Sequence, residues 1–314
     1  MRYLEPAETS LRLPVIGQGT WGFGEDRRRH TAEVDALREG FSLGMTLVDT
    51  AEIYGTGESE RVVADAIRDC RDDIFLVTKI WPNHAEPQAM RRALEASLRR
   101  LRTDRVEACL LHWPTRSVPL PRIADGLRAL RDAGLAQDVG VSNFPTPMAG
   151  EIAARLAARG DGAQSVFFHE LPYSLEDRRV EKTLLPQLRA VRGVLLAYSP
   201  LGHGRLLRHT GSGAQALAQV AARRGISPAQ AALAFLAQEE GVIVLAKAAS
   251  AAHVRQNAES ADVRLTEEDL ALLRRAYPVA GRDIGILLPP YAAFFSLAFG
   301  GMRLGQNLRG RRSR

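Results

Sequence analysis

The sequence predicts an α/β fold, a (β/α)8 or TIM barrel, formed by a single domain over residues 1–278 with a C-terminal extension over residues 279–314. Eight short apolar runs alternate with eight segments in which apolar residues recur at helical spacing. No Ser/Pro-rich linker or change in composition interrupts the series, and 314 residues, 46% of them hydrophobic, can bury one large core. Because eight consecutive strand–helix units close a parallel barrel, we expect a closed sheet surrounded by helices.

The predicted strands are short, and they occur in order at residues 15–20, 47–49, 74–78, 106–111, 138–142, 164–168, 194–198 and 242–246. Helices are predicted between them from apolar residues three or four positions apart. The first three present Val34, Leu37 and Phe41; Val62, Val63, Ala66 and Ile67; and Met90, Leu94, Leu98 and Leu101. The others are expected around residues 123–130, 152–156, 184–191, 215–236 and from 251 onwards. An extra helix over residues 265–277 would begin at Thr266, a favourable N-cap with acidic residues behind it.

Composition argues against several functional classes. The two cysteines, Cys70 and Cys109, are too few for a disulfide framework, and the seven histidines do not fall at ligand spacing with acids, so we expect no metal. Five of the six net positive charges come from the arginines of residues 301–314, which leaves a nearly neutral body and argues against nucleic-acid binding. The start of the chain lacks a basic stretch followed by a long apolar one, so we expect no secretory signal and a cytoplasmic protein.

The C-terminal extension combines an apolar stretch, residues 284–300, with the arginine-rich end. The stretch is short for a spanning helix and contains Pro289 and Pro290, so no integral membrane segment is expected. We expect it to act as a lid that brings Tyr291, Phe294 and Phe295 to the substrate mouth, with a mobile basic tail behind it.

Polar residues follow the predicted strands. In such barrels the reactive groups lie where strands end and βα loops begin. In chain order these positions hold Asp49, with Tyr54 in the loop behind it, Lys79, His112, Ser142 with Asn143, His169 with Glu170, Tyr198 with Ser199, and Lys247.

The first four of these residues suit the reduction of a carbonyl group. Hydride addition to a carbonyl creates an alkoxide, which needs a proton donor. Tyr54 can donate that proton if the ammonium of Lys79 lowers its pKa, and Asp49 can hold Lys79 charged and oriented. His112 can donate a hydrogen bond to the carbonyl oxygen and polarise it.

Seven ordered segments resemble the aldo-keto reductases, and the resemblance covers roughly residues 12 to 275. The segments are LPVIGQGTWGFG, MTLVDTAEIYGTGESE, IFLVTKIWP, ACLLHWP, DVGVSNF, LLAYSPLGHG and VIVLAKAASAAHVRQN. The stretch HELPYSLEDRRVEKTLLP is most similar to bacterial members that act on small aldehydes and dicarbonyls.

The resemblance implies an NADPH-dependent reductase of aldehydes or ketones in which Asp49, Tyr54, Lys79 and His112 form the catalytic tetrad. It implies that Ser142 and Asn143 hold the nicotinamide carboxamide, that Tyr198 stacks on the ring, that Lys247 meets the 2′-phosphate, and that Gln256 and Asn257 lie near the adenine. Further cofactor contacts are expected at Thr20, Trp21, Glu170, Ser199, Leu201 and His253. An apolar substrate pocket is expected from Trp21, Trp81, Trp113 and Phe144.

Two departures from the family pattern concern the cofactor. His169-Glu170 stands where the family usually has Asn-Gln, so an amide that contacts nicotinamide becomes an acid. His253 stands where many members have an arginine, and Ala248 where they have a hydroxyl. Because Lys247 alone is a point charge, we expect NADPH to be preferred over NADH, but only moderately.

Two alternatives remain open. The run Gly17-Gln18-Gly19-Thr20-Trp21-Gly22 matches a dinucleotide-binding fingerprint, but no helix opens directly after it, so we interpret the glycines as room for backbone near the substrate. The barrel could also serve as a non-catalytic, nucleotide-sensing regulatory subunit. The expected partner is a small carbonyl compound, and the expected state is a monomer or weak dimer.

Overall fold

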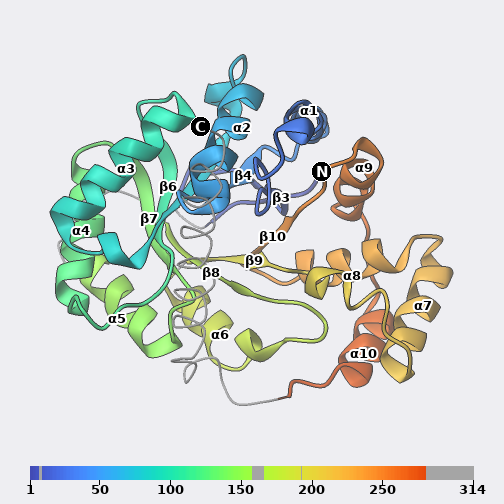
Figure 1. The fold of residues 1–314 in the computed structure, drawn as a ribbon. Helices are drawn as coiled ribbons and strands as arrows, with labels where there is room; N and C mark the ends of the chain where they lie inside the picture. Colours follow the sequence, from blue (N-terminus) through green and yellow to red (C-terminus); the bar gives the residue numbers. More distant parts are fainter. Residues whose placement is uncertain (7–8, 158–165, 192, 281–314) are drawn as a thin grey trace, which may run out of the picture.

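The computed structural model describes residues 1–6, 9–157, 166–191 and 193–280. Eight parallel strands form a closed barrel, and helices surround it (Figure 1). The strands are β3 (Ile16–Gly19), β4 (Leu47–Asp49), β5 (Phe75–Ile80), β6 (Val106–Leu111), β7 (Ala136–Ser142), β8 (Phe167–Pro172), β9 (Val194–Tyr198) and β10 (Val242–Ala246). They follow one another around the barrel, which closes where β10 pairs with β3, with Val244 beside Ile16. The predicted fold is therefore confirmed.

The helices of the described chain fill the connections between strands. They are α1 (His30–Ser42), α2 (Glu58–Ala66), α3 (Pro87–Leu101), α4 (Leu120–Asp132), α5 (Thr146–Ala157), α6 (Leu184–Ala190), α7 (Ser212–Arg224), α8 (Pro228–Ala237), α9 (Ala251–Ser260) and α10 (Glu267–Ala276). The predicted cap of α10 is present, because the Thr266 side chain accepts from the Asp269 backbone N–H in a capping box.

Two element predictions were wrong in detail. The single helix expected over residues 215–236 is two helices. Gly225 ends α7 in the left-handed region (φ +65°), and Ser227 begins α8 with a capping box ahead of Pro228. The sixth barrel strand begins and ends later than residues 164–168, since β8 continues through His169 and Glu170. Because His169 and Glu170 are polar, the apolar pattern ended before the strand did.

A short antiparallel hairpin, β1 (Tyr3–Leu4) with β2 (Leu13–Pro14), precedes the barrel and was not predicted. Leu13 is fully buried in the same cluster as the interior barrel residues Leu47 and Phe168. The amino group of Met1 lies 2.9 Å from a carboxylate oxygen of Asp262, beyond the end of α9 (Figure 1). The hairpin thus fixes the start of the chain to the barrel.

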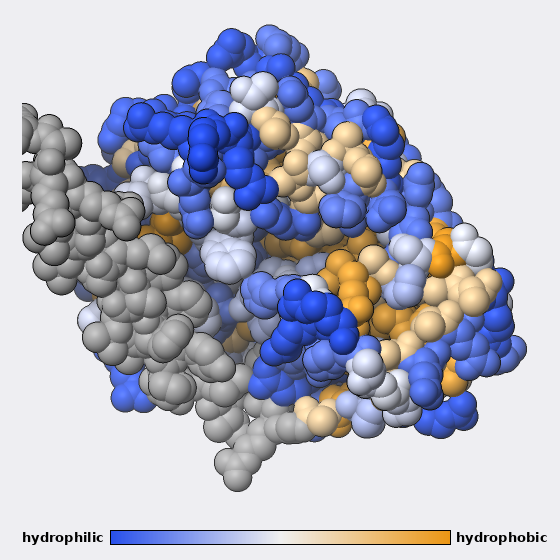
Figure 2. Space-filling view, turned by 45° about the vertical axis from the view of Figure 1, so that its right-hand side comes forward, coloured by the Kyte–Doolittle hydropathy of each residue, from blue (hydrophilic) through white to orange (hydrophobic). Residues whose placement is uncertain are grey.

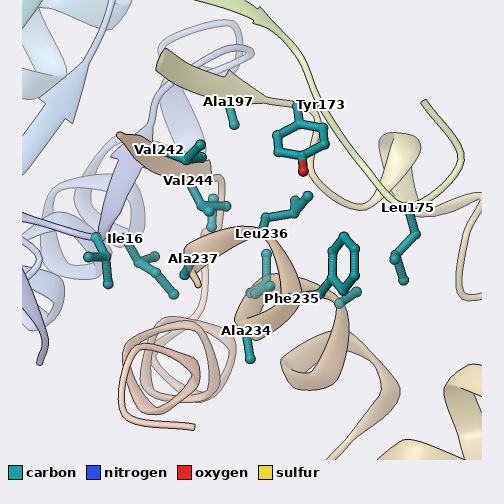
Figure 3. Close-up of a cluster of buried hydrophobic side chains, with 14 of the residues drawn as sticks. Ile16, Tyr173, Leu175, Ala197, Ala234, Phe235, Leu236, Ala237, Val242 and Val244 are labelled. Atoms are coloured by element: carbon teal, nitrogen blue, oxygen red, sulfur yellow. The ribbon is translucent and has the colours of Figure 1, made fainter. Parts of the chain in front are cut away.

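The core has an inner and an outer part. The inner cluster fills the barrel with one or two side chains from most strands, among them Leu47, Val77, Leu110, Phe168, Leu196, Ile243 and Leu245. Two outer clusters lie between strands and helices. In the first of them, α8 is buried from Gln230 to Ala237, and its Phe235 and Leu236 pack in the same cluster as Tyr173 and Val244 (Figure 3). Burying one such large side chain contributes about 1.5–3 kcal/mol, so the outer layer stabilises the barrel strongly.

On the face of the molecule that Figure 2 shows, hydrophilic residues predominate and apolar residues lie between them. Among the described residues, the large apolar side chains that are well exposed are Trp21, Val191 and Leu207. Within the same described ranges, no helix is long and apolar enough to cross a membrane.

Candidate active site

The polar residues predicted at the strand ends share one geometric property. Side chains alternate along a strand, so a residue two positions beyond an interior residue also faces the interior. Asp49 follows Leu47 in this way, and Lys79 follows Val77. The same relation holds for His112, Glu170, Tyr198 and Lys247, which follow Leu110, Phe168, Leu196 and Leu245. Ser142 follows Gly140, where a side chain would meet the interior residue Leu110. The strands therefore aim these side chains at the carboxyl-terminal mouth of the barrel.

Lys79 is at the centre of the group and is fully buried. Its ammonium donates to an Asp49 carboxylate oxygen, to the backbone oxygen of Thr50 at 3.0 Å and to the Tyr54 hydroxyl at 3.4 Å. A carboxylate oxygen of Glu170 lies 3.1 Å away. The structure thus brings Asp49, Tyr54 and Lys79 together as predicted, and adds Glu170, whose contact with Lys79 the sequence did not suggest.

The loop after β4 presents Tyr54 through a tight turn. Tyr54 begins a 3-10 helix, η2 (Tyr54–Gly57), in which Gly55, Thr56 and Gly57 all have positive φ. This sharp turn places the ring with its centroid 5.1 Å from the Lys79 ammonium. The His112 ring meets it edge-on, with centroids 5.7 Å apart.

The proton affinity of Tyr54 differs from the sequence-based expectation. Burial raises the pKa of Tyr54, and although the Lys79 ammonium lowers it, the net direction is upward. The lowering expected from Lys79 is therefore present, but it does not determine the net direction. Desolvation of a phenolate inside the barrel outweighs one neighbouring cation when two carboxylates, Asp49 and Glu170, also face the ring.

His112 is a neutral hydrogen-bond donor in this environment. Burial, together with the Lys79 ammonium, lowers the pKa of His112 well below its usual value. The Trp81 ring packs edge-on against it, with centroids 5.4 Å apart. Its Nδ1 has no hydrogen-bond partner among the described residues. The neutral imidazole has one N–H, which suits it to polarise an oxygen atom at the mouth.

Ser142, Asn143 and Tyr198 form a chain of hydrogen bonds beside these groups. The Tyr198 hydroxyl donates to the Asn143 side-chain oxygen at 2.8 Å, and the Asn143 amide donates to the Ser142 hydroxyl at 2.9 Å and to the His112 backbone oxygen at 3.0 Å. Asn143 has a positive φ of 62°, which turns the chain sharply after β7. These polar groups, rigidly held, could bind a carboxamide at the mouth.

An anion-binding arrangement follows β10. Lys247 is exposed, with its ammonium 5.5 Å from the Phe23 ring centroid, and forms no ion pair with any described residue. Ser250 caps α9, whose N-terminal N–H groups attract negative charge. His253 and Gln256 are exposed on this helix, whereas Asn257 is largely buried. A phosphate could therefore be held by Lys247 and the start of α9.

The other predicted cofactor residues have different surroundings. Thr20 is fully buried, and its hydroxyl donates to the Asp49 backbone oxygen at 2.9 Å and accepts from Ser59 at 2.8 Å. Ser199 lies 3.2 Å from a ring nitrogen of His203, and Leu201 is half-buried. Thr20 therefore supports the position of Asp49 within the barrel.

Of the predicted pocket residues, Trp21 is exposed and meets the His203 ring edge-on at 5.5 Å, and Trp81 and Trp113 are half-buried. Phe144 is fully buried in an outer core cluster, so its ring offers no accessible surface to a substrate. His203 was not predicted. Its contact with Trp21 joins two loops that are distant in sequence.

The glycine-rich run has a structural explanation. A side chain at Gly17 would meet Leu47 inside the barrel at 2.7 Å, so Gly17 makes room for core packing and not for substrate. After β3 the chain passes through a 3-10 turn, η1 (Arg27–Arg29), before α1 begins at His30. The dinucleotide-fingerprint alternative, which needs a helix directly after the strand, is excluded. Across the described part of the chain, no group of three or more His, Cys, Asp or Glu side chains is placed to hold a metal ion.

The fold and this set of side chains define a class of protein. A parallel barrel with a phenol, an ammonium and an imidazole at its mouth is equipped to protonate an oxygen atom that gains negative charge.

Comparisons with known proteins identify the family. The profile of the Aldo/keto reductase family matches residues 15–278. Methylglyoxal reductase YeaE from Escherichia coli is 38% identical over 268 residues, which are 85% of this chain and 92% of that protein. The crystal structure of an aldo/keto reductase from Klebsiella pneumoniae in complex with NADP and acetate has a TM-score of 0.81 and 38% identity, over 90% of this chain and 97% of that chain. The thermostable aldo-keto reductase Tm1743 in complex with epalrestat has a TM-score of 0.80 and 33% identity, over 88% and all of that chain (100%).

The chain therefore belongs to the aldo/keto reductase family. It is an NADP-dependent oxidoreductase that acts on carbonyl groups, and the resemblance found in the sequence is confirmed.

Proposed function

We propose that this protein reduces small aldehydes and dicarbonyl compounds, methylglyoxal among them, with NADPH as the hydride source and Tyr54 as the proton donor. The observation that carries the proposal is the contact of the Tyr54 hydroxyl with the buried Lys79 ammonium, 3.4 Å away, beside the His112 ring. The relative named methylglyoxal reductase supports the substrate class.

The roles of the side chains follow from their contacts. Tyr54 gives its proton to the oxygen that becomes an alkoxide, and the Lys79 ammonium stabilises the phenolate left behind. Asp49 and the Thr50 backbone oxygen hold Lys79 in place. His112, which is neutral, donates a hydrogen bond to the substrate oxygen and so orients the carbonyl toward Tyr54.

The residues at the mouth fit NADPH. The cofactor supplies the hydride when bound. Ser142, Asn143 and Glu170 would bind the carboxamide and Tyr198 would pack against the ring, while Lys247 and the N-terminus of α9 would hold the 2′-phosphate, which the hydrogen bonds among Ser142, Asn143 and Tyr198 and the cap of α9 support. Because Ala248 adds no donor and Lys247 is a single point charge, we expect NADPH to be preferred over NADH only moderately.

The substrate pocket is apolar in this proposal. Trp21, Trp81 and Trp113 offer aromatic surface near the mouth. The division into a barrel over residues 1–278 and an extension that covers the mouth remains part of the proposal, since residues 281–314 lie outside those that the structure describes. We also propose a cytoplasmic protein that is a monomer or weak dimer, which light scattering and cell fractionation would test.

An assay of turnover separates this proposal from the regulatory-subunit alternative. A panel of aldehydes and ketones is offered with NADPH, and NADPH absorbance is followed for the wild-type protein and for Tyr54→Phe. Carbonyl-dependent oxidation that Tyr54→Phe lowers by about 10²-fold or more is expected. The alternative would be supported by an absence of turnover with every carbonyl, and unchanged turnover in Tyr54→Phe would refute the assigned proton donor.

A further inference from the structure

The Tyr54 hydroxyl and a Glu170 carboxylate oxygen both lie close to the Lys79 ammonium. An ammonium has three N–H groups. Asp49 and the Thr50 backbone oxygen accept two of them. The third donates to the Tyr54 hydroxyl at 3.4 Å, and a Glu170 carboxylate oxygen lies 3.1 Å from the same nitrogen without a hydrogen bond to it. That Glu170 oxygen is buried and has no aligned hydrogen bond in the described part of the chain, so it is available to take the N–H from Tyr54.

The groups around Glu170 determine the pH at which it ionises. Asp49 faces it from β4, Lys79 from β5, Tyr54 from η2 and Tyr198 from β9. The neighbouring strand β7 adds no titratable side chain at this level, since it ends at Ser142 and Asn143 follows. Two carboxyls thus face one ammonium inside the barrel. Burial, reinforced by the Asp49 carboxylate, raises the pKa of Glu170 to about 8.

We propose that Glu170 is a positioning residue of the reductase, whose carboxylate competes with the Tyr54 hydroxyl for the N–H of Lys79 that Asp49 and Thr50 do not hold. The inference rests on the proposed function. When Glu170 carries a proton it is neutral, and Lys79 turns its free N–H to Tyr54. When Glu170 is ionised, Lys79 turns the same N–H to the Glu170 carboxylate. The negative charge of Glu170 also raises the pKa of Tyr54, so Tyr54 donates its proton less readily. Proton donation to the substrate is therefore weakened as Glu170 ionises.

The decisive variant is Glu170→Gln, which keeps the shape of the side chain and removes the charge. Asp138→Asn is the matched control. Asp138 is another buried acid of the barrel wall, nearer the start of β7, and it accepts a hydrogen bond from the Val166 backbone at 2.8 Å. The kcat/KM for reduction of methylglyoxal with NADPH is measured from about pH 6 to about pH 9 for the three proteins, a range that spans the change in charge.

The ratio of kcat/KM for Glu170→Gln to that of the wild type should rise about tenfold over this range, because the wild type alone loses a proton beside Tyr54. For Asp138→Asn the ratio should change by less than about threefold. Parallel profiles for Glu170→Gln and wild type, or a ratio that falls with pH, would overturn the proposal. A purely structural role of Glu170 would lower activity by a similar factor at every pH.

A second measurement does not depend on turnover. Infrared difference spectra of the protein without cofactor, wild type minus Glu170→Gln, should contain the carbonyl band of a buried carboxylic acid at about pH 6 that is lost toward about pH 9. Glu170→Asp should keep a titrating band with a smaller effect on the kinetic profile, since its shorter side chain withdraws from Lys79. A difference spectrum without an acid band at about pH 6 would overturn the proposal even in an active enzyme. If no carbonyl is reduced at all, the proposed function fails while the infrared result still tests the proton on Glu170.

Discussion

Replacing Lys79 by methionine should destabilise the protein in a manner that depends strongly on pH. The change removes an ammonium that lies between Asp49 and Glu170, and it leaves two carboxyls facing each other in a fully buried site. Methionine fills a similar volume, so little of the effect should come from a cavity. The cost is therefore dominated by charge.

The magnitude follows from the contacts. Removing one partner of a buried ion pair costs about 3–5 kcal/mol, because the remaining charge is left without compensation. Burial already raises the pKa of Asp49 and of Glu170, and without Lys79 both should rise further. An acid whose pKa is higher in the folded state binds protons more tightly when folded. The stability that this acid contributes to the folded state is thus fully present at low pH and is lost as pH rises through the pKa of the acid in the folded state. The loss in unfolding free energy should be about 3–5 kcal/mol near pH 8 and at least about twofold smaller near pH 5.

The assay is urea denaturation at these two pH values, followed by circular dichroism. Lys247→Met is the matched control, because Lys247 is exposed and forms no ion pair within the described residues. Its unfolding free energy should stay within about 0.5 kcal/mol of wild type at both pH values. A loss for Lys79→Met that is equal at both pH values, or below about 1 kcal/mol near pH 8, would refute the charge argument.

Three further changes test other parts of the molecule. Tyr54→Phe should lower kcat by about 10²–10⁴-fold while leaving the dissociation constant of NADPH, measured by tryptophan fluorescence, within about twofold. Lys247→Met should raise the dissociation constant of NADPH by about tenfold and change that of NADH little, since NADH lacks the 2′-phosphate. Gly40→Ala should lower the unfolding free energy by about 1–3 kcal/mol in thermal unfolding. Its Cβ would lie 2.2 Å from the Gln18 amide oxygen, and that amide donates to two buried backbone oxygens.

Each of these has a result that would contradict it. Weaker NADPH binding in Tyr54→Phe would mean that the hydroxyl organises the cofactor site. Equal effects of Lys247→Met on both cofactors would place the 2′-phosphate elsewhere. An unchanged melting temperature in Gly40→Ala would show that the Gln18 side chain moves aside without loss of its bonds.

The barrel was predictable because its strands are short apolar runs, and because the segments between them have apolar residues at helical spacing. The apolar pattern gave the wrong strand bounds where polar residues lie inside a strand, as His169 and Glu170 do in β8. The pattern also missed the end of α7 at Gly225, because apolar residues at helical spacing occur on both sides of this glycine. The N-terminal hairpin is too short to give a pattern, since each strand has two residues.

The members of the candidate site were predictable because chemistry restricts them to strand ends, but their mutual contacts were not. Which oxygen faces the Lys79 ammonium depends on how β8 and β5 lie across the closed barrel, and no sequence spacing encodes that distance. The sequence indicated the effect of Lys79 on the pKa of Tyr54 but not the net direction, because burial, the largest influence on that pKa, is visible only in three dimensions.

The closure of the barrel between β3 and β10 also has a consequence for biosynthesis. Ile16 is among the first residues of the barrel to leave the ribosome, whereas its partner Val244 emerges near the end. Until then β3 and β9 each have an unpaired edge, which other chains could pair with. Such distant contacts slow folding. A chain that stops before β10 would therefore be expected to need a chaperone and to be degraded, even though all four residues of its tetrad have already been made.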